Sequence, residues 1–174
     1  MAASPDEKTT SLFVELLGKE LVCALGCTEP IALAYGAALA GRMLAEPVEH
    51  MVVRCSGNII KNVKSVVVPN SGGLKGVEVA AMLGLLGGDA DRELEVLQSV
   101  TPEVVERAQA LIAQGFCEVE LVEGVPNLFI VVEVSGAGHT ASVTLRDRHT
   151  NVVDVTRDGE TIQRDAHDED DDAY

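Results

Sequence analysis

The chain has 174 residues, of which 47% are hydrophobic and only 3% aromatic, so one domain with an aliphatic core is expected. Thirteen Lys and Arg against 28 Asp and Glu give a net charge of −15. This balance excludes nucleic-acid binding and docking on an anionic membrane, because both need clustered cations. Four cysteines do not make a disulfide scaffold, and neither a signal peptide nor a membrane span is evident, which favours a cytoplasmic protein with reduced thiols.

Apolar residues recur at helical spacing in five segments. Gly26 is expected to stop the first helix, and Thr28 can cap the second, which is apolar all round and should be buried. Thr101 is expected to cap the last helix, and Pro102 is expected to lie in its first turn. The predicted helices cover residues 12–25, 28–44, 77–86, 89–100 and 102–114.

Other segments are rich in valine or alternate apolar with polar residues, as strands do. The predicted strands cover residues 50–55, 64–69, 118–122, 128–134, 141–146 and 152–156. Turn-length connections between the later strands favour antiparallel pairing. The pattern therefore predicts an α+β fold, with N-terminal apolar helices packed on a sheet that is mainly antiparallel and can be mixed. This domain should span residues 10–164, between a flexible N-terminus (1–9) and a disordered acidic tail (165–174).

Cys27 is the first candidate for chemistry. Its thiol lies just before a predicted helix N-terminus, where the helix dipole and free amide groups favour the thiolate. A thiolate there can be a nucleophile or a metal ligand. The alternative is a small buried side chain at a helix junction, because free cysteines are often buried. The nearby Cys23 is expected to belong to the core.

Two polar strings are the next candidates. Ser56, Asn58, Lys61 and Asn62 lie between two predicted strands and could recognise a carboxylate or an amino group, or could form an exposed turn. The second string is a glycine-rich turn, whose backbone N–H groups could cradle an anion or serve a structural role. It consists of Asn70, Ser71, Gly72 and Gly73, and it lacks the spacing of a phosphate-binding P-loop.

The four histidines have no pair at the helical spacing of metal ligands. His50 and His139 lie at strand starts, His149 in a turn and His167 in the tail. Each is therefore expected to be an ordinary surface or strand-end residue.

Three sequence blocks carry a resemblance to a known family. They are residues 24–34 (ALGCTEPIALA), 56–63 (SGNIIKNV) and 67–73 (VVPNSGG). These blocks closely resemble the L-cysteine desulfidase family, whose proteins are related to the serine dehydratase α chain. The resemblance keeps the order of the blocks and covers roughly residues 10–160.

The resemblance implies a cytoplasmic enzyme that converts L-cysteine into pyruvate, ammonia and sulfide with a [4Fe–4S] cluster. In that family the cysteine matching Cys27 counts among the cluster ligands, and the other ligand cysteines lie in a C-terminal half that this sequence lacks. One thiolate cannot hold such a cluster. Cys23, Cys55 and Cys117 are not expected to be ligands. The chain is therefore interpreted as an isolated N-terminal domain that is inactive alone and whose partner is a C-terminal serine dehydratase α-type domain.

Within this interpretation, Lys61 could neutralise the substrate carboxylate or act as the base, while Ser56, Asn58, Asn62 and the turn at 70–73 contact the substrate. Glu29 is expected to complete a helix cap rather than to act in catalysis. Two alternatives stay open: an L-serine dehydratase-type lyase, and a non-catalytic amino-acid-binding or assembly module. A homodimer is also plausible, because helices that should meet the missing half would leave an apolar patch.

Overall fold

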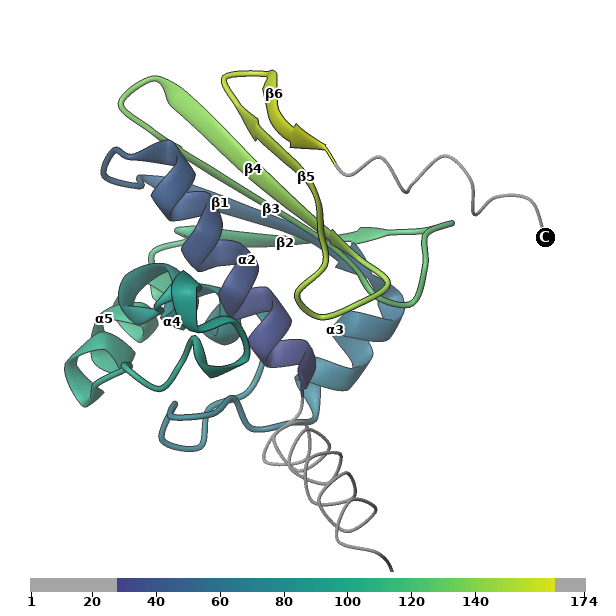
Figure 1. Cartoon of the computed structure of the whole chain (residues 1–174). Helices are drawn as coiled ribbons and strands as arrows, with labels where there is room; N and C mark the ends of the chain where they lie inside the picture. Colours follow the sequence, from purple (N-terminus) through teal and green to yellow (C-terminus); the bar gives the residue numbers. More distant parts are fainter. Residues whose placement is uncertain (1–27, 165–174) are drawn as a thin grey trace, which may run out of the picture.

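The computed structural model describes residues 28–164. Several sequence predictions lie outside these residues. They are the helix over 12–25, its stop at Gly26, the core position of Cys23, the ligand role of Cys27, the flexible N-terminus (1–9), and the disordered tail (165–174) with His167. The described residues form one six-stranded sheet with helices packed on it (Figure 1).

The sheet has the strand order β2-β1-β3-β4-β5-β6. Its strands are β1 (His50–Ser56), β2 (Cys117–Val122), β3 (Phe129–Gly136), β4 (His139–Arg146), β5 (Val152–Arg157) and β6 (Glu160–Arg164). β1 pairs in parallel with β2, and every other neighbouring pair is antiparallel. The predicted α+β fold with a mainly antiparallel sheet is therefore confirmed, and the sheet is mixed.

The helices are α2 (Thr28–Leu44), α3 (Gly57–Lys64), α4 (Val77–Gly87) and α5 (Pro102–Ala113). α2 crosses β3 and β4 and packs along α4, which in turn contacts α5. Alternate residues of β1, β3 and β4 are buried beneath these helices, as the period of a strand requires. The helices predicted over 28–44, 77–86 and 102–114 are confirmed, and Thr101 caps α5 by accepting a hydrogen bond from the Val104 N–H.

The strand predicted over residues 64–69 is wrong. Its first residue ends α3, and the segment that follows forms only an isolated bridge between Val67 and Lys75. The hydroxyl of Ser56 caps α3, and Ile59 and Val63, four residues apart, bury one side of that helix. The capped helix α3 therefore forms, and the valines that follow it do not build a strand despite their strand propensity.

The amphipathic helix predicted over 89–100 is also wrong. Only a 3₁₀ segment, η1 (Ala90–Glu95), forms there, and Glu93 has a non-helical backbone with φ 48° and ψ −105°. The strand β6 was not predicted, because its side chains do not alternate between apolar and polar. Asp158 and Gly159, both at positive φ, make the tight turn that returns the chain from β5 to β6.

Candidate functional site

The three blocks that carry the family resemblance meet at one end of the molecule. α2 begins there, α3 lies beside its first turns, and the loop that contains residues 70–73 lies at the same end (Figure 1). The connection between β4 and β5 also reaches this end. We take this end as the candidate site and describe it residue by residue.

Thr28 and Glu29 of α2 meet a histidine from the distant β4–β5 connection. The Thr28 Oγ1 atom lies 2.8 Å from His149 Nε2, within hydrogen-bond distance. The Glu29 Oε1 atom lies 3.9 Å from the same nitrogen, and both side chains are half-buried. Thr28 was predicted to cap α2, but it is the first residue of that helix, and its hydroxyl lies beside His149. His149 lies in a turn, as predicted, but it is half-buried and contacts α2 rather than being an ordinary surface residue.

The sequence could not reveal this contact, because the two residues are 121 positions apart. The β4–β5 connection is held by its own hydrogen bonds. Asn151 donates its side-chain amide to the Arg146 carbonyl at 3.0 Å, and the Asp147 N–H donates to the Leu128 carbonyl at 2.9 Å. These bonds place His149 over the start of α2.

The first polar string proves to be the cap and the body of α3 rather than a turn. Ser56 is buried, and its hydroxyl accepts from the Ile59 N–H and donates to the Asn127 carbonyl. Its hydrogen-bonding capacity is therefore largely used within the fold. Asn58 and Lys61 are exposed, and Asn62 is half-buried. Among the described residues, no hydrogen bond or ion pair engages the side chains of these three.

The second string is a turn with positive φ at Asn70, Gly72 and Gly73. The Asn70 side-chain amide donates to the Leu97 carbonyl at 2.8 Å. The buried Ser71 hydroxyl accepts from the Leu74 N–H at 2.9 Å and donates to the Leu74 carbonyl at 3.1 Å. The turn is therefore ordered by its own side chains, which is the structural role left open above.

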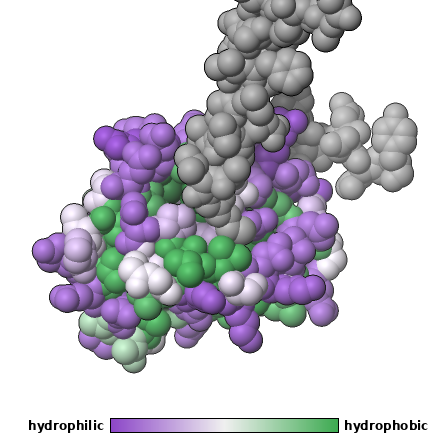
Figure 2. Space-filling view, turned by 90° about the horizontal axis from the view of Figure 1, so that it is seen from below, coloured by the Kyte–Doolittle hydropathy of each residue, from purple (hydrophilic) through white to green (hydrophobic). Residues whose placement is uncertain are grey.

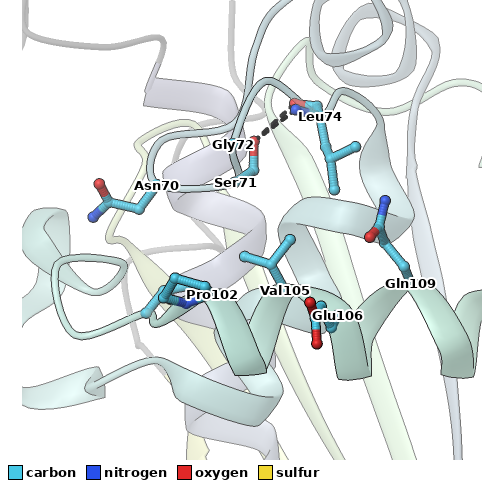
Figure 3. A pocket seen from close by; sticks show the side chains of 9 residues that line it. Asn70, Ser71, Gly72, Leu74, Pro102, Val105, Glu106 and Gln109 are labelled. Carbon is cyan, nitrogen blue, oxygen red and sulfur yellow. Dashed lines mark hydrogen bonds between the residues drawn. The ribbon is translucent and has the colours of Figure 1, made fainter.

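A pocket of about 550 Å³ lies between this turn and α5. Leu74 points from the turn toward α5, from which Val105 and Gln109 point back (Figure 3). Asn70, Ser71 and Gly72 line the pocket, and Glu106 adds a carboxylate. Ligand pockets commonly have this size and this mixture of apolar walls and a few polar groups. The sequence did not single out Glu106 or Gln109, because only the fold brings α5 to the turn.

The predicted substrate residues therefore fall into two groups. Asn70, Ser71 and Gly72 share the pocket, whereas α3 and its cap do not line it. Within residues 28–164, no hydrogen bond joins the polar side chains of α3 to the turn at 70–73. The two groups share one end of the molecule, and an apolar area ringed by hydrophilic residues covers part of that end (Figure 2).

The two described cysteines, Cys55 and Cys117, are free and buried. Burial, with a smaller contribution from Glu78, raises the pKa of Cys55 to about 11 and that of Cys117 to about 12. Such raised pKa values are typical of structural rather than reactive cysteines. No group of three His, Cys, Asp or Glu side chains within residues 28–164 could hold a metal ion. The described residues thus do not fit a [4Fe–4S] cluster by themselves.

No helix in the described part of the chain is both long and apolar enough to cross a membrane. α2, the longest of these helices, has 17 residues.

Comparison with known proteins identifies relatives without a stated activity. The chain is similar to proteins named UPF0597 from Lachnoclostridium phytofermentans (45% identical over 146 residues, 84% of this chain and 35% of the relative) and Treponema denticola (42% over 159 residues, 91% and 37%). A UPF0597 protein of Oleidesulfovibrio alaskensis is 45% identical over 152 residues, which are 87% of this chain and 35% of the relative. The chain spans about a third of the length of these relatives. No protein-family model matches it.

Proposed function

We propose that this chain is the N-terminal part of a cytoplasmic lyase of the L-cysteine desulfidase type. The observation that carries the proposal is that the three blocks of the resemblance meet at one end of the fold, beside a pocket. In the proposed reaction, L-cysteine loses its α-proton and hydrosulfide. The resulting enamine tautomerises to an imine, and water converts the imine into pyruvate and ammonia.

The remaining two-thirds of the enzyme would come from polypeptide beyond the third of the relatives' length that this chain matches. Because the described residues do not fit an iron–sulfur cluster alone, the cluster of the proposed enzyme needs Cys27 and thiolates from that additional polypeptide. The completing partner is proposed to be a serine dehydratase α-type domain, and the chain alone is proposed to be inactive. The apolar area at the site end is a surface that such a domain, or a second copy of the chain, would cover (Figure 2).

Substrate recognition is the part that this chain's own residues supply. The exposed ammonium group of Lys61 has no ion-pair partner among the described residues and can bind a carboxylate. Asn58 lies one turn earlier on α3 and can add a hydrogen bond. Gly72 lines the pocket, and Gly73 follows it in the same turn without lining the pocket. Neither glycine has a neighbour within 4 Å of an added Cβ, so a ligand can approach their backbone closely. Asn70 and Ser71 hold that backbone in place.

Two other functions follow from the same residues. An L-serine dehydratase-type lyase would use the same contacts with hydroxide as the leaving group. A non-catalytic amino-acid-binding or assembly module is favoured by one observation, the exposure of Asn58 and Lys61 on the surface of α3. Measuring turnover of L-cysteine and of L-serine distinguishes these two functions from the proposed desulfidase.

The test measures sulfide and pyruvate released by the complete protein, made by joining this chain to the segment that completes its relatives' length. We expect turnover of L-cysteine to exceed that of L-serine. K61M should raise KM at least tenfold, because the carboxylate loses its cation, whereas the matched variant K64M, also exposed on α3, should not. Preferred turnover of L-serine would support the dehydratase. Binding of L-cysteine without turnover would identify a binding module and refute the lyase.

A further inference from the structure

The hydrogen bond between Thr28 and His149 joins the end of the sheet to the block that carries Cys27. Thr28 follows Cys27 directly in the sequence, and its Oγ1 atom lies 2.8 Å from His149 Nε2. Glu29 Oε1, at 3.9 Å from the same nitrogen, is beyond hydrogen-bond distance. Thr28 is therefore the bonded partner, and Glu29 adds only electrostatic attraction when the ring is protonated.

The first turn of a helix is the part most in need of such an anchor. Its first four N–H groups have no partner inside the helix, so the turn frays unless side chains hold it. The β4–β5 connection that carries His149 is itself fixed, by the Asn151 amide on the Arg146 carbonyl and by the Asp147 N–H on the Leu128 carbonyl. A fixed hydrogen-bonding partner for Thr28 therefore restricts the motion of that turn.

We propose that His149 is a positioning residue for the first turn of α2, which begins with Thr28 and Glu29. By bonding the Thr28 side chain, it fixes the first turn of α2 against the end of the sheet. The inference rests on the proposed function, because the placement of this turn matters for turnover only if the turn belongs to the lyase site.

The first test measures backbone hydrogen exchange in this chain alone. In an α-helix the amides of Ala32 and Leu33 bond to the carbonyls of Thr28 and Glu29, so they report on the first turn. We expect H149A and T28V each to speed their exchange at least fivefold, and the double variant to exchange no faster than either single one. H149Q should restore slow exchange, because its amide nitrogen can replace Nε2. Unchanged exchange in H149A would overturn the anchor.

The matched control is H139A. His139 is also partly exposed and hydrogen-bonded, with its Nδ1 atom 3.0 Å from Asp158 Oδ2, but it lies at the opposite end of β4 from the connection that carries His149. H139A should leave exchange at Ala32 and Leu33 unchanged. Equal acceleration in H139A would show a general loosening of the fold and overturn a specific role for His149.

The second test measures kcat and KM for L-cysteine in the complete protein. A positioning role predicts that H149A lowers kcat at least tenfold with little change in KM, that H149Q recovers part of the loss, and that H139A behaves as wild type. Faster exchange with an unchanged kcat would reduce His149 to a structural residue and overturn the proposal. A wild-type protein that releases no sulfide would refute the proposed lyase, while the exchange data would still decide the anchor.

Discussion

At the scale of single residues, the hydrogen bonds distinguish side chains that stabilise the fold from side chains that can bind a ligand. Ser56 was predicted to contact substrate, but its hydroxyl caps α3 and bonds the Asn127 carbonyl. Asn58 and Lys61, from the same sequence block, remain exposed. The block therefore combines a helix start with two side chains that can meet a ligand, a division that residue types alone could not reveal.

S56A should lower the free energy of unfolding by about 1 to 2 kcal/mol, because α3 loses its cap and a partly buried carbonyl loses its donor. Urea unfolding measures the change. The matched control is S65A at the other end of α3, where the exposed hydroxyl makes two long hydrogen bonds of 3.3 Å to the Lys61 and Asn62 carbonyls. S65A should change stability by less than about 0.5 kcal/mol. Equal effects of the two variants would contradict the cap role of Ser56.

The buried thiols make stability depend on alkaline pH. The ordinary thiol pKa of 9.0 rises to about 11 in Cys55 and about 12 in Cys117. Above pH 9 the unfolded chain releases these protons while the folded chain keeps them, so ionisation favours unfolding. The stabilisation is fully present below pH 9 and is lost progressively as the pH rises through 11 and 12.

Unfolding by urea at pH 8 and pH 10.5 checks this linkage. We expect wild type to lose more stability between the two values than the double variant C55A/C117A, in which the titrating thiols are absent. Other groups that titrate in this range contribute equally to both proteins, so their effect cancels in the comparison. Tyr35, whose pKa is raised mainly by burial, is one of them. An equal loss of stability between pH 8 and pH 10.5 in the two proteins would contradict the raised pKa values of the two thiols.

At the scale of elements, the contact between α2 and α4 holds the helical layer together. An added Cβ on Gly84 would lie 2.1 Å from the Ala34 carbonyl oxygen, so only glycine lets the two backbones come this close. Gly41, on the other helix, differs, because an added Cβ there would meet the movable end of the Leu85 side chain at 2.7 Å.

G84A should therefore destabilise the fold by about 3 kcal/mol, since the helices must separate. G41A should stay within about 1 kcal/mol of wild type, because Leu85 can turn away and alanine favours the helix. Thermal unfolding of both variants measures the difference. A milder effect of G84A than of G41A would show that the helices do not approach as described.

The elements also show what the sequence can predict. α2, α4 and α5 were predicted because long apolar runs and a Thr-Pro start identify a helix locally. α3 was missed because its eight residues carry only two buried side chains. The helix over 89–100 was predicted wrongly because the non-helical backbone at Glu93 interrupts a helical sequence pattern. The pocket and the His149 contact depend on pairing between distant segments, so no local pattern contains them.

At the scale of the whole molecule, the chain is a mixed sheet with one helical layer, and it spans about a third of the length of its UPF0597 relatives. The sequence blocks of the resemblance, the pocket and the apolar area all lie at one end (Figure 1, Figure 2). This clustering supports the proposal that the chain is one part of a lyase whose site is completed by additional polypeptide.

Anaerobic iron–sulfide reconstitution tests this proposal. Visible absorption of a cluster and sulfide release from L-cysteine are measured for this chain alone, for the complete protein and for its C27A variant. We expect a cluster and sulfide release only in the complete protein, with both lost in C27A. A complete protein that forms no cluster, or a C27A variant with full activity, would contradict it.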